Sequence, residues 1–175
     1  MKKQYFISTS FFAVMTTSLL SLSSATFAKE QHTNTHHEHD KHDIEMGVSV
    51  GYAYLEEENE GGTNLHLHIM KKLSGEGIQK YLSVGIGFET IFAHEQHNAA
   101  MLALGIHPWN NVVFTVSAGT EWAKHNGVTE SGSVMHLEAT YLFEAEGYHY
   151  GPVVGYAKTH EDQHYTVGMH FGFPL

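Results

Sequence analysis

The sequence predicts an all-β protein, an eight-stranded antiparallel up-and-down transmembrane β-barrel. Three observations predict it. Eight segments alternate apolar residues with small or polar ones, which is the two-residue period of a β-strand. The second face of these segments is rich in Gly, Ala and Ser, which suits a narrow barrel lumen better than a solvated sheet. Aromatic residues gather near the ends of the segments, as they do at membrane interfaces.

The first 28 residues have the features of a secretory signal peptide. Lys2 and Lys3 give a positive start, residues 6–22 are largely apolar, and residues 26–28 form a small-x-small cleavage site. We therefore expect residues 1–28 to be a signal peptide that is cleaved after Ala28. A membrane-anchor helix is the alternative, but its apolar stretch is short for a span of about 20 residues.

Residues 29–43 form a polar segment that is rich in histidine. The segment has no apolar periodicity, so we expect it to be disordered and, in the exported protein, periplasmic. Neutral imidazoles bind Zn²⁺, Cu²⁺ and Ni²⁺, and neighbouring carboxylates add ligands or orient the imidazoles. We predict weak binding of such an ion here, with a plain polar spacer as the alternative. The candidate ligands are His32, His36, His37, His39 and His42.

The predicted barrel occupies residues 44–175. Its alternating segments are Met46–Tyr54, Leu65–Met70, Leu82–Glu89, Met101–Ile106, Val112–Gly119, His136–Phe143, Tyr148–Ala157 and His164–Phe173. Pro152 lacks a backbone donor, so we expect a bulge or another local irregularity beside it. Tight turns are expected at residues 74–77, 108–111 and 145–147. Longer acidic or histidine-bearing loops are expected at 56–62, 93–98, 124–132 and 159–163, on the outside, because an even strand count places both termini at one end.

Composition excludes several kinds of function. The chain has no cysteine, so disulfides, thiolate zinc sites, cysteine nucleophiles and lipid-anchored cysteines are ruled out. Its formal net charge is −10, and its nine basic residues are all lysines that form no stripe, which argues against nucleic acid as a partner. Sixteen histidines, all beyond the signal peptide, require a further explanation.

The environment of the protein depends on which strand face lies inside. In a soluble β-sandwich the apolar face forms the core, whereas in a membrane barrel it meets lipid. The small-residue face, the aromatic strand ends and the need to close eight apolar strands without free edges favour the membrane barrel. A soluble periplasmic metal-binding β-sandwich is the alternative.

The last strand carries the motif Thr166-x-Gly168-x-x-Phe171-x-Phe173 near the end of the sequence. This motif resembles the C-terminal assembly signal of bacterial outer-membrane β-barrels, although Pro174 and Leu175 follow the terminal aromatic residue. Over residues 44–175 the chain resembles the small eight-stranded outer-membrane proteins of Gram-negative bacteria. The resemblance implies a monomer in outer-membrane lipid, inserted by the barrel-assembly machinery, with the N-terminal segment in the periplasm.

Several histidines and carboxylates are expected inside the barrel or at its outer mouth. Six inward positions in the outer halves of the strands are His66, His68, Glu89, Glu121, His136 and Glu138. The adjoining loops contribute His94, His97 and His160, and His164 begins the last strand. A cation that entered from outside would meet these groups. Alternatively, the lumen histidines and glutamates satisfy one another as a structural network, and His149 and His170 are expected to be structural.

The function that these patterns favour is non-enzymatic binding of a divalent transition metal ion, zinc first and Cu²⁺ or Ni²⁺ next, for capture, buffering or sensing at the envelope. No cofactor is required. A structural or adhesion barrel without a metal role is the alternative. An enzyme that uses His136 and Glu138 with Ser131 or Ser133 is disfavoured, because no nucleophile-elbow motif is present. An open pore is disfavoured because side chains fill an eight-stranded barrel. Protonation of imidazoles near pH 6 should weaken metal binding.

Overall fold

The computed structural model describes residues 43–125, 128–159 and 162–175. The strands in these ranges are β1 (Ile44–Leu55), β2 (Glu60–Lys72), β3 (Leu82–Phe92), β4 (Gln96–Trp109), β5 (Val112–His125), β6 (Val128–Tyr141), β7 (Phe143–Ala145), β8 (Tyr148–Lys158) and β9 (Gln163–Pro174). A short 3₁₀ helix, η1 (Gln79–Tyr81), precedes β3. The predicted signal peptide, the predicted ligands His32, His36, His37, His39 and His42, and His160 lie outside the described residues.

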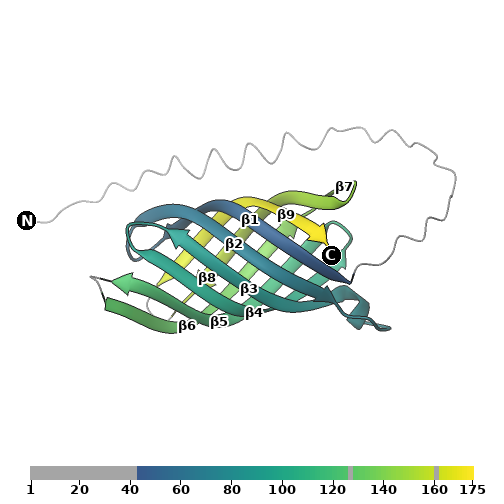
Figure 1. Ribbon diagram of the computed structural model, residues 1–175, viewed down its shortest axis with the longest axis horizontal. Coiled ribbons are helices and arrows are strands. Elements are labelled where there is room, and N and C mark those ends of the chain that lie inside the picture. The colour runs from purple at the N-terminus through teal and green to yellow at the C-terminus, as the bar shows by residue number, and fades with distance from the viewer. Residues whose placement is uncertain (1–42, 126–127, 160–161) are drawn as a thin grey trace, which may run out of the picture. The chain divides into compact units, whose positions relative to one another are not determined.

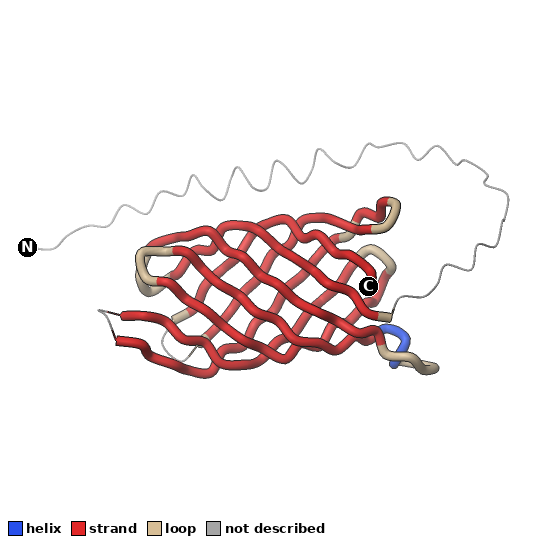
Figure 2. Tube along the Cα trace, in the orientation of Figure 1, coloured by secondary structure: helices blue, strands red, loops and turns tan. Residues whose placement is uncertain are grey.

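The strands form one closed antiparallel barrel (Figures 1 and 2). Each strand pairs with its neighbour in the sequence, and β9 returns to pair with β1 from Glu45↔Pro174 to Leu55↔His164. Pairing of β6 with β8 completes the circle. The short strand β7 pairs with β8 in the register that β6 has left, so β6 and β7 are two parts of one barrel strand. The predicted eight-stranded barrel is therefore confirmed.

The break between β6 and β7 lies opposite Pro152. Pro152 sits in β8 and pairs with Met169 of β9 without a register shift. On the other side of β8, the ladder with β6 ends at Thr140↔Val153 and resumes with β7 at Phe143↔Tyr150. Proline has no N–H to donate, so the pairing is interrupted opposite it. The predicted irregularity is thus an interrupted ladder rather than a bulge. The register shift in this barrel lies between β4 and β5, between Ile106 and Trp109.

The lengths of the connections at the two ends of the barrel differ from those predicted. We define the hairpin end by the turns β1–β2, β3–β4, β5–β6 and β8–β9. There, the β1–β2 connection contains only residues 56–59 and the β3–β4 connection only residues 93–95. At the terminal end, which holds Ile44 and Pro174, the β2–β3 connection spans residues 73–81, where a tight turn was predicted. The loops predicted at 56–62 and 93–98 were too long, because residues 60–62 and 96–98 continue the hydrogen-bonded ladders of β2 and β4 although they are mostly polar or glycine.

The outward face of the barrel is apolar and the inward face is polar or small. Leu102 and Ile86, in the middle of their strands, are 71% and 58% exposed, whereas Ser49, His66 and Ser117 are buried. Exposed aromatic residues cluster near the strand ends, with ring contacts such as Tyr148–Phe173 at 6.3 Å. This inverted distribution contradicts the soluble β-sandwich, whose core would bury the same apolar side chains.

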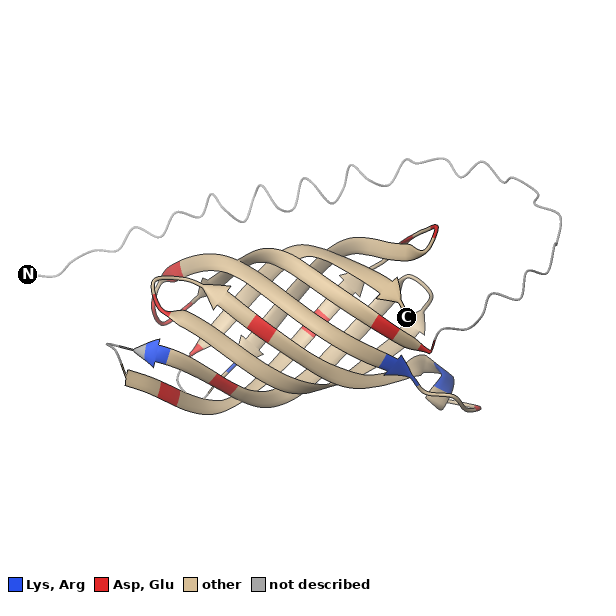
Figure 3. Ribbon diagram, in the orientation of Figure 1, with Lys and Arg blue, Asp and Glu red and all other residues tan. Residues whose placement is uncertain are grey.

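Lysines and mid-strand glutamates occupy different parts of the barrel (Figure 3). The described lysines, Lys71, Lys72, Lys80, Lys124 and Lys158, are exposed and lie at or beyond strand ends, whereas Glu89 and Glu138 lie within strands and point into the lumen. A mid-strand carboxylate therefore has no lysine beside it and must be matched by other groups.

None of the described helices combines the length and the apolar character that crossing a membrane requires.

Candidate metal site in the barrel lumen

Three buried side chains from three strands converge inside the barrel. Glu89 of β3, His136 of β6 and His164 of β9 occupy inward positions of their alternating strands and are 3%, 3% and 2% exposed. The Nε2 atom of His136 lies 2.9 Å from Oε2 of Glu89, and Nε2 of His164 lies 3.6 Å from the same oxygen. One ligand atom from each residue falls within 4.8 Å of the other two. We call these residues the Glu89 group.

The Nε2 atoms of His136 and His164 lie at ion-pair distance from Oε2 of Glu89. Neither contact is a well-aligned hydrogen bond, so Glu89 satisfies the two nitrogens only in part. Asn64 of β2 donates from Nδ2 to Oε1 of Glu89 at 2.5 Å, so the amide fixes one carboxylate oxygen and leaves Oε2 facing the two imidazoles. Orientation of a carboxylate by a neighbouring amide is typical of the surroundings of a metal ligand.

An apolar cluster lies beside the Glu89 group, toward the hairpin end. Ile91 is the next inward residue of β3 after Glu89 and is 1% exposed. Leu55 pairs with His164 across β1 and β9 and is fully buried. Together with Ala53 and the partly buried Ala93, these side chains form an apolar cluster. Apolar neighbours lower the local dielectric beside the imidazoles, which strengthens their electrostatic attraction to a cation.

Two further imidazole–carboxylate pairs flank the Glu89 group. His66 Nδ1 contacts Oε1 of Glu138 at 3.1 Å, toward the terminal end. Toward the mouth, His97 Nδ1 contacts Oε1 of Glu121 at 2.7 Å, and His97 Nε2 lies 3.3 Å from Oε1 of Glu58. Both Glu138 and Glu121 therefore already have an imidazole partner.

The mouth of the barrel at the hairpin end is acidic. A cavity of about 620 Å³ opens there, and its carboxylates come from Glu57, Glu58, Glu95, Glu121, Glu130 and Asp162. Partial burial raises the pKa of Glu58, with Glu60 and Asp162 adding to the rise and His97 opposing it. A cavity with this lining attracts cations from solution.

The structure places the predicted ligands as follows. His66, His68, Glu89, Glu121, His136 and Glu138 all point inward, as predicted, and His164 joins them. His97 belongs to β4 and points inward, although a loop position was predicted. His94 lies exposed in the β3–β4 turn, where its backbone N–H donates to Oε1 of Glu60 at 3.0 Å. It does not join the inward groups.

Sequence reasoning missed some of the groups that the structure brings together. Glu45 of β1, His149 of β8 and His170 of β9 form a second set, with one ligand atom from each within 4.8 Å of the others. His149 and His170 were expected to be structural, and Glu45 was not considered. The inward phase of Glu45 at the start of β1 was readable from the alternation. Its proximity to two strands at the end of the chain follows only from barrel closure.

The residues weighed for an enzyme are not assembled. Ser133 is exposed and neighbours buried Val134, so it lies on the face of β6 opposite to His136. Ser131 is also exposed and lies at the mouth.

An eight-stranded closed barrel with an apolar outer face and a polar lumen is a transmembrane β-barrel, and its fold is that of the small bacterial outer-membrane barrels. No protein-family model and no curated protein sequence matches the chain. Among solved structures, it is similar to the attachment invasion locus protein Ail of Yersinia pestis in complex with the heparin analogue sucrose octasulfate. That match has a TM-score of 0.50 and 13% identity, and it covers 75% of this chain and 99% of Ail.

Two further solved structures are similar. The N-terminal β-barrel domain of Pseudomonas aeruginosa OprF matches with a TM-score of 0.47 and 10% identity, covering 75% of this chain and 98% of that domain. A de novo designed transmembrane β-barrel matches with a TM-score of 0.49 and 14% identity, covering 73% of this chain and 94% of the design.

Proposed function

We propose that this protein is a non-enzymatic outer-membrane barrel that binds a divalent transition metal ion in its lumen, at Glu89, His136 and His164. One observation carries the proposal: two buried Nε2 atoms converge on one oxygen of a buried carboxylate without forming a well-aligned hydrogen bond to it. Poorly aligned polar contacts leave part of the cost of burial uncompensated, and a bound cation would satisfy both nitrogens at once.

The ligand set suits zinc first. Two imidazoles and one carboxylate give three protein ligands, and a water molecule would complete the tetrahedral arrangement that zinc favours. Cu²⁺ and Ni²⁺ also accept imidazole and carboxylate ligands. Calcium and magnesium prefer oxygen ligands, so they would compete poorly for this site.

The proposed location is the outer membrane of a Gram-negative bacterium, with the terminal end of the barrel in the periplasm. Ile44 and Pro174 both lie at the terminal end, as an even number of barrel strands requires. The two-residue turns 110–111 and 146–147 lie at this end as well, together with the longer connection 73–81. The His-rich segment that ends at residue 43 would then enter the periplasm and would add metal-binding capacity there, at His32, His36, His37, His39 and His42. Outer-membrane lipid and the barrel-assembly machinery are the proposed partners of a monomer.

Zinc titration of the refolded full-length protein in detergent tests the site. We expect His136→Asn to abolish one bound zinc equivalent, or to weaken it more than about 100-fold, because a ligand contributes more than its supporting residues do. His94→Asn is the matched control, since His94 is an exposed histidine of the β3–β4 turn. Equal binding by wild type, His136→Asn and His94→Asn would contradict the proposal.

The amide that orients Glu89 supplies a second prediction. Asn64→Ala removes the donor to Oε1 of Glu89 and leaves all three ligands in place. We expect zinc affinity to fall about 10- to 100-fold, the usual effect of removing such a partner. The same titration measures it, with Thr166→Ala as a control, because Thr166 also lies on the lumen face but outside the Glu89 group. An unchanged affinity in Asn64→Ala would show that the amide does not support a ligand.

A structural barrel without a metal role is the second candidate. His66–Glu138 and His97–Glu121 each pair an imidazole with a carboxylate directly, and such pairs hold a lumen together without an ion. The absence of any zinc equivalent that depends on His136 would favour this candidate.

A further inference from the structure

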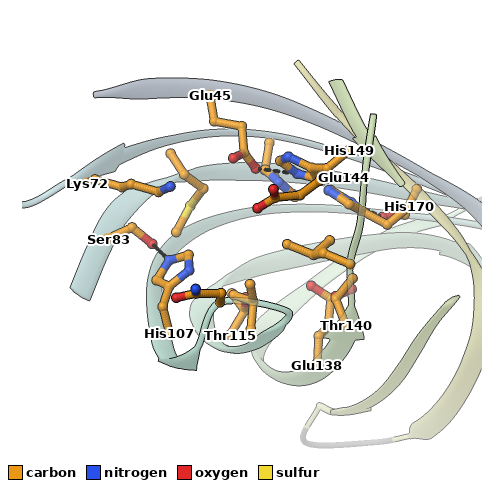
Figure 4. Close-up of a pocket in the computed structure, with 16 residues that line it drawn as sticks. Glu45, Lys72, Ser83, His107, Thr115, Glu138, Thr140, Glu144, His149 and His170 are labelled. Carbon is orange, nitrogen blue, oxygen red and sulfur yellow. Dashed lines mark hydrogen bonds and ion pairs between the residues drawn. The ribbon is translucent and has the colours of Figure 1, made fainter. Parts of the chain in front are cut away.

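A second set of possible ligands lies at the opposite end of the lumen from the Glu89 group. Oε1 of Glu45 is 3.2 Å from Nε2 of His149, and the rings of His149 and His170 stack with centroids 5.5 Å apart (Figure 4). His170 is 4% exposed, and Ser49 Oγ contacts its Nδ1 at 3.1 Å, which leaves Nε2 for a ligand. The contact between His149 Nε2 and Glu45 is at ion-pair distance but is not a well-aligned hydrogen bond. We call Glu45, His149 and His170 the Glu45 group.

The Glu45 group borders a cavity at the terminal end of the barrel. The cavity has a volume of about 100 Å³, and its lining includes His68, His107 and Lys72. His107 is held by Ser83, whose Oγ lies 2.9 Å from its Nε2 (Figure 4). The cavity is large enough for several water molecules, so an ion in the Glu45 group could exchange with the terminal end.

An unbroken series of imidazoles joins the two groups through the lumen. Successive ring centroids are 5.3 Å apart for His164–His136, 6.4 Å for His136–His66, 5.5 Å for His66–His68, 5.2 Å for His68–His170 and 5.5 Å for His170–His149. We call these six histidines the imidazole file. At these distances, a cation bound to one ring also lies near the next ring.

Glycines on the lumen face make room for the file. A Cβ atom on Gly47 would collide with Nε2 of His68, and one on Gly172 would collide with Nε2 of His149. A Cβ on Gly87 would come within 2.9 Å of Nε2 of His66. These rings therefore occupy space that a side chain at the glycine positions would fill.

The charges along the file favour a divalent cation. Glu89, Glu138 and Glu45 stand beside its beginning, middle and end, and each contacts at least one file histidine. Lys72 lines the cavity beside the Glu45 group, but no described lysine forms an ion pair with these three carboxylates, and the sequence contains no arginine.

We propose that the Glu45 group is a second transition-metal site and that the imidazole file passes an ion between it and the Glu89 group, so that the barrel transfers zinc-like ions from the acidic mouth to the terminal end. The transfer rests on the proposed function, because the Glu89 group supplies the ion. Side chains fill an eight-stranded lumen, so hydrated ions do not flow through it as through a pore. Passage requires an ion that exchanges water for imidazole, which zinc does and Mg²⁺ resists.

Equilibrium titration tests the second site in the full-length protein. We expect His149→Asn and Glu45→Gln each to remove one zinc equivalent relative to wild type, His136→Asn to remove a different one, and the His136→Asn/His149→Asn double variant to remove two. Every variant keeps the N-terminal histidines, so zinc bound to them does not contribute to the difference in zinc equivalents between variants. Retention of every equivalent in both His149→Asn and Glu45→Gln overturns the second site. Loss in His136→Asn would then leave the proposed function standing alone.

Zinc entry into vesicles tests the transfer. Full-length protein in phosphatidylcholine vesicles that enclose a zinc-sensitive dye should admit external Zn²⁺ at least about tenfold faster than protein-free vesicles, and a Mg²⁺-sensitive dye should report no matching entry. His68→Asn and His68→Gln interrupt the file outside both groups, so they should retain both zinc equivalents and lose most of the entry rate. His94→Asn should behave as wild type. Zinc entry at the protein-free rate, or an unchanged rate in both His68 variants, overturns the transfer.

Discussion

Replacing Glu89 with alanine is expected to lower the free energy of unfolding of the metal-free barrel by about 3–5 kcal/mol, which is the usual cost of removing one partner from a buried charged network. Glu89 accepts from Asn64 Nδ2 and faces Nε2 of His136 and His164. Alanine leaves these three polar groups buried without an acceptor. Urea-induced unfolding of the barrel in phosphatidylcholine vesicles measures the change.

Zinc separates the role of Glu89 in binding from its role in packing. At a zinc concentration about 100 times the dissociation constant, wild type should gain about 2.7 kcal/mol of stability, whereas Glu89→Ala should gain none from this site. Glu89→Gln keeps the shape of the side chain and should fall between wild type and Glu89→Ala in stability without recovering zinc binding. Glu146→Ala, in the exposed β7–β8 turn, is the control. If Glu89→Ala lowers the free energy of unfolding by less than about 0.5 kcal/mol, the carboxylate does not stabilise the metal-free barrel.

A lysine in the middle of the outward face is expected to destabilise the barrel by about 2–4 kcal/mol in a bilayer. Leu102 lies halfway along β4, pairs with Ile86 and Ala118 on the flanking strands, and is 71% exposed. In Leu102→Lys the ammonium group would meet lipid hydrocarbon and could reach water only by distorting the bilayer. Urea unfolding in vesicles and the heat-dependent shift in gel mobility report the loss.

The matched control for Leu102→Lys lies on the same strand and the same face. Gln96 begins β4 at the hairpin end, so Gln96→Lys should cost only about 0–1 kcal/mol near the interface. If lysine has the same small effect at residues 96 and 102, the outward face meets water, and the membrane assignment of the apolar face is wrong.

Several features of the fold could be predicted from the alternation alone. The inward phase of His66, Glu89 and His136 is correct in the structure, because a strand places every second side chain on the same face whatever its neighbours are. The closing position of the last strand was predicted from the alternation of all eight segments, and β9 does pair with β1 along its length.

Strand ends and connections were predicted less well. His97 was assigned to a loop, yet it lies in β4 and pairs with Ala123 of β5. Residues 73–81 were expected to contain a tight turn and instead form the connection that includes η1. Backbone pairing in β2, β4 and β6 extends into residues 60–64, 96–98 and 129–133, which are polar or glycine, so the sequence carries no apolar alternation there.

The sequence by itself determined which side chains enter the lumen, because the two-residue period of a strand depends on local backbone geometry. Only the tertiary structure decided which of these side chains meet. Glu89, His136 and His164 come from three strands, and Glu45 meets His149 and His170 only when the first and last strands of the barrel pair. Distances across a lumen depend on the stagger of every strand pair around the barrel, and that stagger is fixed by closure rather than by any one segment.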